Sequence, residues 1–163
     1  MPEFAHKDAC ELLDADHIAV KHLFVDYARL AVAPDADATT AQRTALATKI
    51  CDELTIHAEI EEEIFYPALR EALPDAGNLL DEATAEHQEA KQLIADIRAV
   101  GQANPTMDTL VAELNVAIEH HVKEERDELF PKAKAAPGVD LVALGEQLRD
   151  RQQQLQADPA AIT

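Results

Sequence analysis

The chain has 163 residues, of which 32 are acidic and only 14 are basic, so its formal net charge is −18. Such a charge repels nucleic acid and anionic membrane surfaces, and we expect neither as a partner. Four glycines and no tryptophan, with many alanines, leucines and glutamates, favour helices over strands. The sequence shows neither a signal-peptide core nor an apolar run of membrane-spanning length, which predicts a cytoplasmic protein. Cys10 and Cys51 fit reduced thiols in that compartment.

Apolar residues recur every three or four positions in four long segments, which is the spacing of one buried helix face. The expected helices cover residues 6–32, 40–72, 78–102 and 106–134, and turns rich in proline, glycine and aspartate separate them. A shorter helix is expected at residues 139–157, where leucines stand among many polar residues. This pattern predicts an all-α fold, an antiparallel up-down-up-down four-helix bundle with a short C-terminal helix. We assign residues 1–136 to the bundle and 137–163 to a helical tail.

The second and fourth expected helices carry the same His-x-x-x-Glu motif in the same frame. His57 and Glu61 form the first pair and His121 and Glu125 the second, and in both helices a proline follows the histidine by ten residues. Residues four apart lie on one face of a helix, about one turn from each other. Each motif therefore directs an imidazole and a carboxylate the same way, as a helix does when it offers two ligands to one metal centre.

Histidines also interrupt the apolar faces of the first and third expected helices, at His17 and His87. A single histidine in an apolar stripe is more often a core residue than a ligand. A buried carboxylate is different, because it costs several kcal/mol unless it is paired or bound to a cation, and no lysine or arginine shares these faces. Four antiparallel helices can bring all these groups to one level of the core. The candidate metal ligands are His17, His57, Glu61, His87, His121 and Glu125.

Imidazole and carboxylate ligands suit iron, manganese or zinc, and no set of thiolates points to zinc or copper(I). Six protein ligands exceed the needs of a four-coordinate structural zinc site, so they favour two ions. In that arrangement Glu61 and Glu125 bridge the ions, and the four histidines are terminal ligands. An oxide or hydroxide bridge would balance the remaining charge.

Residues next to these six are given other roles. His120 fails the alignment with His57 and is expected on the surface or at an interface. Glu62, next to Glu61 in the chain, is a candidate to hydrogen-bond to a metal ligand without binding the metal itself. Tyr27 and Tyr66 are interpreted as core-packing residues.

These motifs resemble the hemerythrin-like, or HHE cation-binding, family over residues 10–135. The matching features are His17, the segment HAEIE from His57 to Glu61 followed by IFYP, His87, and HVKEE from His121 to Glu125 followed by LFP. The resemblance implies a four-helix bundle with a non-haem, oxo-bridged di-iron centre that interacts with dioxygen or related small molecules.

The sequence departs from the oxygen-carrying hemerythrins in two places. Their third helix carries His-x-x-x-His, whereas Lys91 stands four residues after His87 here. Their fourth helix carries His-x-x-x-x-Asp, whereas here Arg126 is the fifth residue after His121 and Glu125 stands one position earlier. One terminal histidine is therefore missing, which leaves an open or water-filled position. This disfavours reversible oxygen carriage and favours peroxide or nitric-oxide chemistry, or iron sensing and storage.

Three functions remain open from the sequence. The first is a di-iron protein that binds dioxygen, peroxide or nitric oxide for carriage, sensing or stress defence. The second is a di-iron peroxidase or catalase-like enzyme. The third is a non-catalytic bundle stabilised by metal, with zinc or manganese as possible substitutes for iron, that acts in iron homeostasis.

Overall fold

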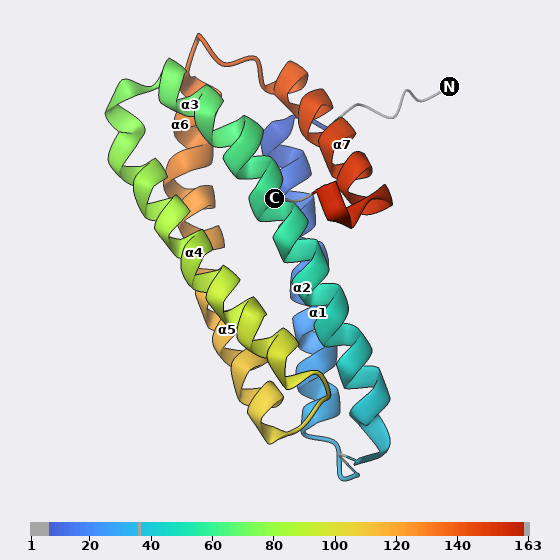
Figure 1. Ribbon diagram of the computed structural model, residues 1–163. Coiled ribbons are helices and arrows are strands. Elements are labelled where there is room, and N and C mark those ends of the chain that lie inside the picture. Colours follow the sequence, from blue (N-terminus) through green and yellow to red (C-terminus); the bar gives the residue numbers. More distant parts are fainter. Residues whose placement is uncertain (1–6, 36, 162–163) are drawn as a thin grey trace.

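The computed structural model describes residues 7–35 and 37–161, and these form helices joined by short turns, without a strand (Figure 1). The helices follow in the order α1 (Ala9–Ala31), α2 (Thr40–Ile60), α3 (Tyr66–Ala72), α4 (Gly77–Val100), α5 (Pro105–Glu124), α6 (Phe130–Ala135) and α7 (Leu141–Ala157). None of the described helices combines the length and the apolarity needed to cross a membrane.

The helices form the predicted antiparallel four-helix bundle. Helix α1 packs against α2 and α5, and α4 packs against α5 and α2, while neighbours in the chain run in opposite directions (Figure 1). Helix α7 lies on α1 and α2 near one end of the bundle. Its fully buried Leu148 and Leu155 join the same core cluster as Leu13 and Phe65. The expected fold class is confirmed, and the division of the chain after residue 136 stays a prediction.

A π-helical turn precedes the proline in each of the two motif helices. The turns cover Glu61–Phe65, between α2 and α3, and Glu125–Leu129, between α5 and α6. The sequence predicts a kink or break at Pro67. The chain does not break and stays helical through the proline, because the wider turn takes up both the missing N–H and the crowding against the preceding carbonyl. Each turn begins at the glutamate of its motif, so the proline also influences where that carboxylate lies.

The hydrophobic core consists of two clusters with a polar layer between them. In α1, Leu13 belongs to one cluster and Val20 to the other, and His17 lies between the two. Helix α4 repeats this order around His87. The two clusters hold the four helices together above and below the polar layer, and the apolar surroundings keep water away from it.

Both cysteines lie in these clusters, with exposed fractions of 2% for Cys10 and 0% for Cys51. Burial raises the pKa of the Cys10 thiol to about 12 and that of Cys51 to about 11. Because the thiolate is the reactive form, we expect the folded protein to resist alkylation near neutral pH, and two thiols to react after denaturation. Mass spectrometry after iodoacetamide treatment checks this. Rapid labelling of the native chain would contradict the burial of the thiols.

Candidate metal centre

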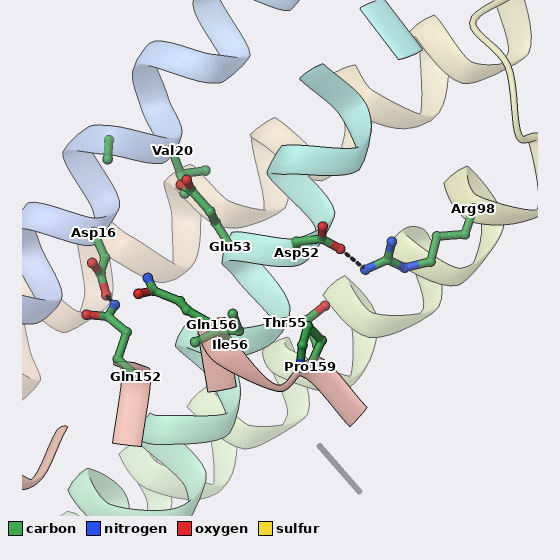
Figure 2. A pocket seen from close by; sticks show the side chains of 11 residues that line it. Asp16, Val20, Asp52, Glu53, Thr55, Ile56, Arg98, Gln152, Gln156 and Pro159 are labelled. Carbon is green, nitrogen blue, oxygen red and sulfur yellow. Dashed lines mark hydrogen bonds and ion pairs between the residues drawn. The ribbon is translucent and has the colours of Figure 1, made fainter. Parts of the chain in front are cut away.

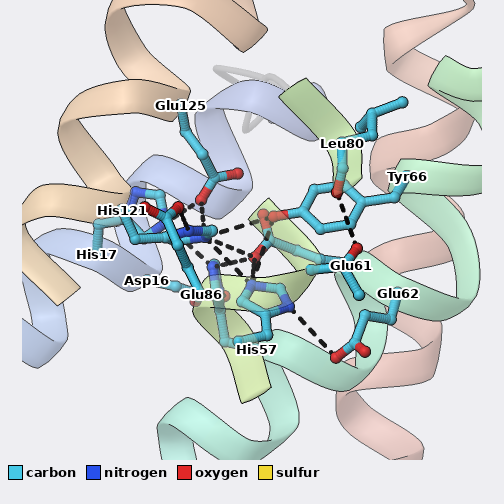
Figure 3. A network of polar contacts seen from close by, with 12 residues as sticks. Asp16, His17, His57, Glu61, Glu62, Tyr66, Leu80, Glu86, His121 and Glu125 are labelled. Atoms are coloured by element: carbon cyan, nitrogen blue, oxygen red, sulfur yellow. Dashed lines mark hydrogen bonds and ion pairs between the residues drawn. The ribbon is translucent and has the colours of Figure 1, made fainter. Parts of the chain in front are cut away.

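All six candidate ligands meet in the polar layer between the two core clusters. None of their residues is more than 7% exposed, and Glu61 is fully buried. His17 comes from α1, His87 from α4, and each motif helix contributes a histidine near the end of its α-helix and a glutamate from its π-helical turn. Figure 3 labels five of the six, all but His87, and their side chains are directed at a common point. The structure thus brings together the residues that the sequence selects.

One half of the cluster is built from α1 and α2. The Nε2 atoms of His17 and His57 lie 3.0 Å apart, and Nε2 of His57 lies 3.1 Å from Oε1 of Glu61. Nε2 of His17 lies 3.4 Å from Oε1 of Glu125. Two nitrogens that each sit about 2.1 Å from one ion are separated by about 3 Å when the angle at the ion is near 90°. The spacing therefore suits nitrogen ligands of a shared cation.

The other half is built from α4 and α5 with the same dimensions. The Nε2 atoms of His87 and His121 lie 3.1 Å apart, and Nε2 of His87 lies 3.1 Å from Oε1 of Glu61. Nε2 of His121 lies 2.8 Å from Oε1 of Glu125. Glu61 and Glu125 thus each contact a histidine from both halves. The geometry describes two neighbouring three- or four-ligand sets with shared carboxylates.

The carboxylates keep unused acceptor atoms inside the protein. The buried Oε2 atoms of Glu61 and Glu125 have no hydrogen-bond partner among the described residues. An unsatisfied buried acceptor costs about 1–3 kcal/mol, and more when it is charged. A cation removes this cost, because carboxylate oxygen is a ligand for divalent metals. The cluster is therefore able to bind metal.

The charges of the cluster are strongly coupled. Burial acts to lower the pKa of His57 and of His121, but the glutamates and outer carboxylates outweigh it, and the values rise to about 10 and about 12. Burial likewise acts to raise the pKa of Glu61, yet His57 and other neighbours hold it well below its usual range. The imidazoles of His57 and His121 thus have a high affinity for a positive charge, and a metal ion competes with protons for these nitrogens.

Three of the four histidines donate a hydrogen bond from their second nitrogen, Nδ1, to a carboxylate outside the cluster. Such partners orient a ligating imidazole and strengthen it as a ligand. The pairs are His57 with Asp16 at 3.1 Å, His87 with Glu62 at 3.2 Å, and His121 with Glu86 at 2.9 Å. The sequence points to Glu62 but not to the other two. Asp16 and Glu86 directly precede His17 and His87, but each holds the histidine of a neighbouring helix.

His17 lacks such a partner. Its buried Nδ1 has no hydrogen-bond partner among the described residues, and Oδ1 of Asp14 lies 3.8 Å away. Asp14 instead accepts a hydrogen bond from Arg126 Nε at 2.6 Å. Arg126 stands one residue after Glu125, as Glu62 stands one residue after Glu61. The two motifs therefore differ at the residue after the glutamate. Glu62 binds His87 in the first motif, whereas Arg126 binds Asp14 in the second.

Asp16 links His57 to α7. Its Oδ2 also accepts a hydrogen bond from Gln152 Nε2 at 2.9 Å, beside a cavity of about 510 Å³ between α1, α2 and α7 (Figure 2). Asp16→Asn removes the charge that holds His57, so we expect metal affinity to fall by about tenfold or more. Competition with a coloured chelator measures this. Asp52→Asn is the control, because Asp52 lines the same cavity but pairs with Arg98; an equal loss in both variants would contradict a specific role for Asp16.

The remaining sequence expectations have clear outcomes. His120 lies on the surface as expected, with 62% of its side chain exposed. Lys91 is partly exposed, at 39% of its side chain, and its Nζ pairs with Glu62 at 3.0 Å. Tyr27 is buried in the core and donates to Asp108. Tyr66 is also buried, but it is more than a packing residue, since its hydroxyl lies 3.4 Å from Nε2 of both His87 and His121.

Comparison with known proteins agrees with this fold. A crystal structure of an HHE domain-containing protein from Mycobacterium kansasii, described as the Rv2633c homolog, superimposes with a TM-score of 0.72. The two sequences are 28% identical, and the match covers 93% of this chain and 88% of that one. The uncharacterized protein Rv2633c of Mycobacterium tuberculosis is 26% identical over 127 residues, which is 77% of this chain and 76% of that protein.

A further relative is much longer than this chain. A protein of Nostoc sp. named DNA nickase is 33% identical over 82 residues, which is 50% of this chain but only 23% of the relative. The model of the hemerythrin HHE cation-binding domain matches residues 8–133, which include all six candidate ligands. The chain therefore belongs to the hemerythrin HHE cation-binding domain family.

Proposed function

We propose that the domain holds two iron ions through His17, His57, Glu61, His87, His121 and Glu125, and that this centre interacts with dioxygen, peroxide or nitric oxide. The observation that carries the proposal is the shared carboxylate: Oε1 of Glu61 lies 3.1 Å from Nε2 of both His57 and His87. One carboxylate between two pairs of imidazoles suits a bridging ligand of a dinuclear site.

The donor set suits iron. Four imidazoles and two carboxylates suit iron, manganese or zinc, and the described residues offer no thiolate at the cluster that would demand zinc. Two iron ions, joined by an oxide or hydroxide, supply reversible redox chemistry toward small oxygen and nitrogen compounds. The histidines and glutamates of this chain orient the ions, and the two apolar core clusters exclude bulk water.

A small cavity beside the cluster supports a ligand of a few atoms. It has a volume of about 20 Å³ and is lined by all four histidines together with apolar residues such as Leu54 and Ile94. This volume is close to that of one water-sized molecule. Ala90 and Lys91 also line it, so part of the space lies where the oxygen carriers place another histidine. The cavity fits a diatomic molecule or peroxide and excludes a larger substrate.

Tyr66 favours a second candidate, a peroxidase or catalase-like activity. Its ring stacks on His87 with 5.4 Å between centroids, and Phe130, its counterpart in the second motif, stacks on His17 at 6.2 Å. Because a phenylalanine is sufficient for packing against His17, packing alone does not explain the hydroxyl group that Tyr66 carries beside His87. Burial first, and then Glu61 and Glu125, raise the pKa of Tyr66 well above its usual range. The phenol keeps its proton and can donate it as a hydrogen bond beside the centre.

Tyr66→Phe tests this second candidate. If peroxide turnover uses the phenolic proton, the rate should fall by about 100-fold while metal content stays the same. Tyr27→Phe is the control, since Tyr27 is equally buried but donates to Asp108, away from the cluster. Oxygen release from peroxide and elemental analysis provide the two readouts. An unchanged rate in Tyr66→Phe would leave packing as the role of this ring.

A purely structural zinc site and a role on DNA have less support. A non-catalytic bundle stabilised by zinc accounts for the buried charges but not for the hydroxyl of Tyr66. A role on DNA would draw on the relative named DNA nickase, of which this chain matches only 23%, and the net charge of −18 opposes contact with phosphates.

Elemental analysis of protein purified without chelators, with a visible spectrum of the same sample, tests the main proposal. We expect about two irons per chain and near-ultraviolet charge-transfer bands from an oxo-bridged ferric pair. Zinc, or a folded protein without metal, would contradict the di-iron proposal and favour a structural role for the bundle. Binding of nitric oxide without turnover of peroxide would favour sensing or carriage over enzymatic activity.

A further inference from the structure

A second group of metal-ligating side chains lies at the surface next to the centre. His120 Nε2 is 3.2 Å from Oε2 of Glu86 and 3.1 Å from Oε1 of Glu124. One ligand atom from each of the three residues can be chosen so that all lie within 4.8 Å of one another. His120 is largely exposed, while 15% of the Glu86 side chain and 26% of the Glu124 side chain are exposed. We call these three residues the outer triad.

The outer triad comes from a second His-x-x-x-Glu pair that overlaps the first. In the second motif, His121 and Glu125 face the core, and His120 and Glu124, one residue earlier, face outward. The other motif helix has no such pair. In the alignment of the two motifs, Ile56 and Ile60 occupy the positions of His120 and Glu124, and both isoleucines are buried. The outer pair is therefore a feature of one motif only, and the centre does not require it.

Glu86 connects the outer triad to the centre through its two oxygens. Oε1 accepts a hydrogen bond from His121 Nδ1 at 2.9 Å, while Oε2 lies 3.2 Å from His120 Nε2. One carboxylate is thus shared between a surface imidazole and a buried one. Figure 3 shows Glu86 beside His121, on the same side of the cluster as Glu125.

A small cavity lies next to both the outer triad and the centre. Its volume is about 10 Å³, and its lining includes Glu86 and Glu124 from the triad and His121 and Glu125 from the centre. Glu125 is 1% exposed, and its Oε2 atom has no hydrogen-bond partner among the described residues. A residue with an unpartnered buried oxygen thus lines the same small space as two carboxylates of the outer triad. This space holds about one water-sized sphere, so a divalent ion passes only after losing most of its water.

The side chains of the outer triad suit the capture and partial dehydration of a divalent ion. An imidazole and two carboxylates are the same types of ligand as those of the centre, so they favour the same divalent ions. They also replace water molecules that the ion must give up. A cleft lined by charges of one sign raises the local concentration and the association rate of oppositely charged ions.

We propose that Glu86, His120 and Glu124 form an outer cation site that captures a divalent transition-metal ion and passes it along Glu86 and Glu125 to the centre. The proposal rests on the proposed function, because it requires that the centre binds metal. It assigns a role to His120 and Glu124 in the rate of metal loading and not in the final amount of metal bound.

Metal uptake by the full-length apoprotein tests the proposal without reference to any catalytic activity. Cobalt(II) is the probe, added anaerobically, and its visible absorption reports ions in the centre during stopped-flow mixing. The test variants are His120→Gln and Glu124→Gln. His22→Gln and Glu89→Gln are matched controls, because His22 is an exposed histidine on α1 and Glu89 an exposed glutamate on α4. Circular dichroism verifies the fold of each variant.

We expect both test variants to load at least about tenfold more slowly than the wild type, and both controls to load normally. The final cobalt content should be equal in all five proteins. Test variants that load as fast as their controls would overturn the outer site. A lower final content in His120→Gln would also overturn it, since His120 would then belong to the centre itself. If the wild type takes up no cobalt at all, the proposed metal centre itself is contradicted. That result differs from test variants that load cobalt as fast as the wild type, which contradict only the outer site.

Discussion

Glu61→Gln should remove at least one metal ion from each chain. Oε1 of Glu61 lies 3.1 Å from Nε2 of His57 in one half of the cluster and 3.1 Å from Nε2 of His87 in the other. It therefore contacts both halves at the same distance, whereas Oε1 of Glu125 lies at 3.4 Å and 2.8 Å from its two histidines. An amide keeps one oxygen but has no negative charge, and its NH₂ group cannot bind a cation. The loss of charge inside an apolar layer therefore weakens both halves of the centre. Elemental analysis of the purified variant gives the result directly.

Glu63→Gln is the control for this experiment. It removes the same charge from the same π-helical turn, but the Glu63 side chain lies at the surface and pairs with Arg151. We expect it to keep the metal content of the wild type, because an exposed ion pair contributes about 0–1 kcal/mol. If Glu61→Gln also kept its full metal content, Glu61 would not be a bridging ligand.

Removal of the metal should lower the thermal midpoint by about 10 °C. A ligand present at about 1,000 times its dissociation constant stabilises the folded state by about 4 kcal/mol. For a chain of this size, each kcal/mol changes the midpoint by about 2–4 °C. The reason lies in the polar layer, where Glu61 and Glu125 hold buried oxygens without hydrogen-bond partners. Thermal unfolding, followed by circular dichroism before and after chelation, measures the change.

Metal specificity provides the control for the thermal experiment. Iron(II) or cobalt(II) should restore the midpoint of the stripped protein, because imidazole ligands favour these ions. Magnesium should not restore it, since Mg²⁺ keeps its water and binds through oxygen ligands. Equal midpoints with and without transition metal would show that the fold does not depend on occupancy of the centre.

The helical bundle and the meeting of the six side chains could both be predicted from the sequence for one physical reason. A period of 3.6 residues assigns each position of an amphipathic helix to a face, and the prolines give the two motifs a common frame. That frame distinguishes His121 from His120, and the structure places the first in the core and the second at the surface.

Other features depend on how the helices are placed around one another. Asp16 and Glu86 hold histidines of neighbouring helices, and helix periodicity contains no information about such partners. Pro67 indicates a local disturbance, but it does not determine that the helix responds with a π-helical turn. The position of Tyr66 depends on this turn, because the extra residue rotates α3 and brings the hydroxyl toward His87. These features therefore depend on how the helices pack together, which the periodicity of the sequence does not specify.

In the proposed two-ion centre, the unequal support of the four histidines should give the two halves different binding strengths. An imidazole that donates to a carboxylate is the more basic ligand, and His17 alone among the four has no such acceptor at Nδ1. Arg126 also adds a positive charge on that side, next to Asp14. The ion held by His17 and His57 should thus be the first to leave and the easier one to exchange. If the cluster holds two ions as proposed, sites that release their ions in sequence could also accept two different metals.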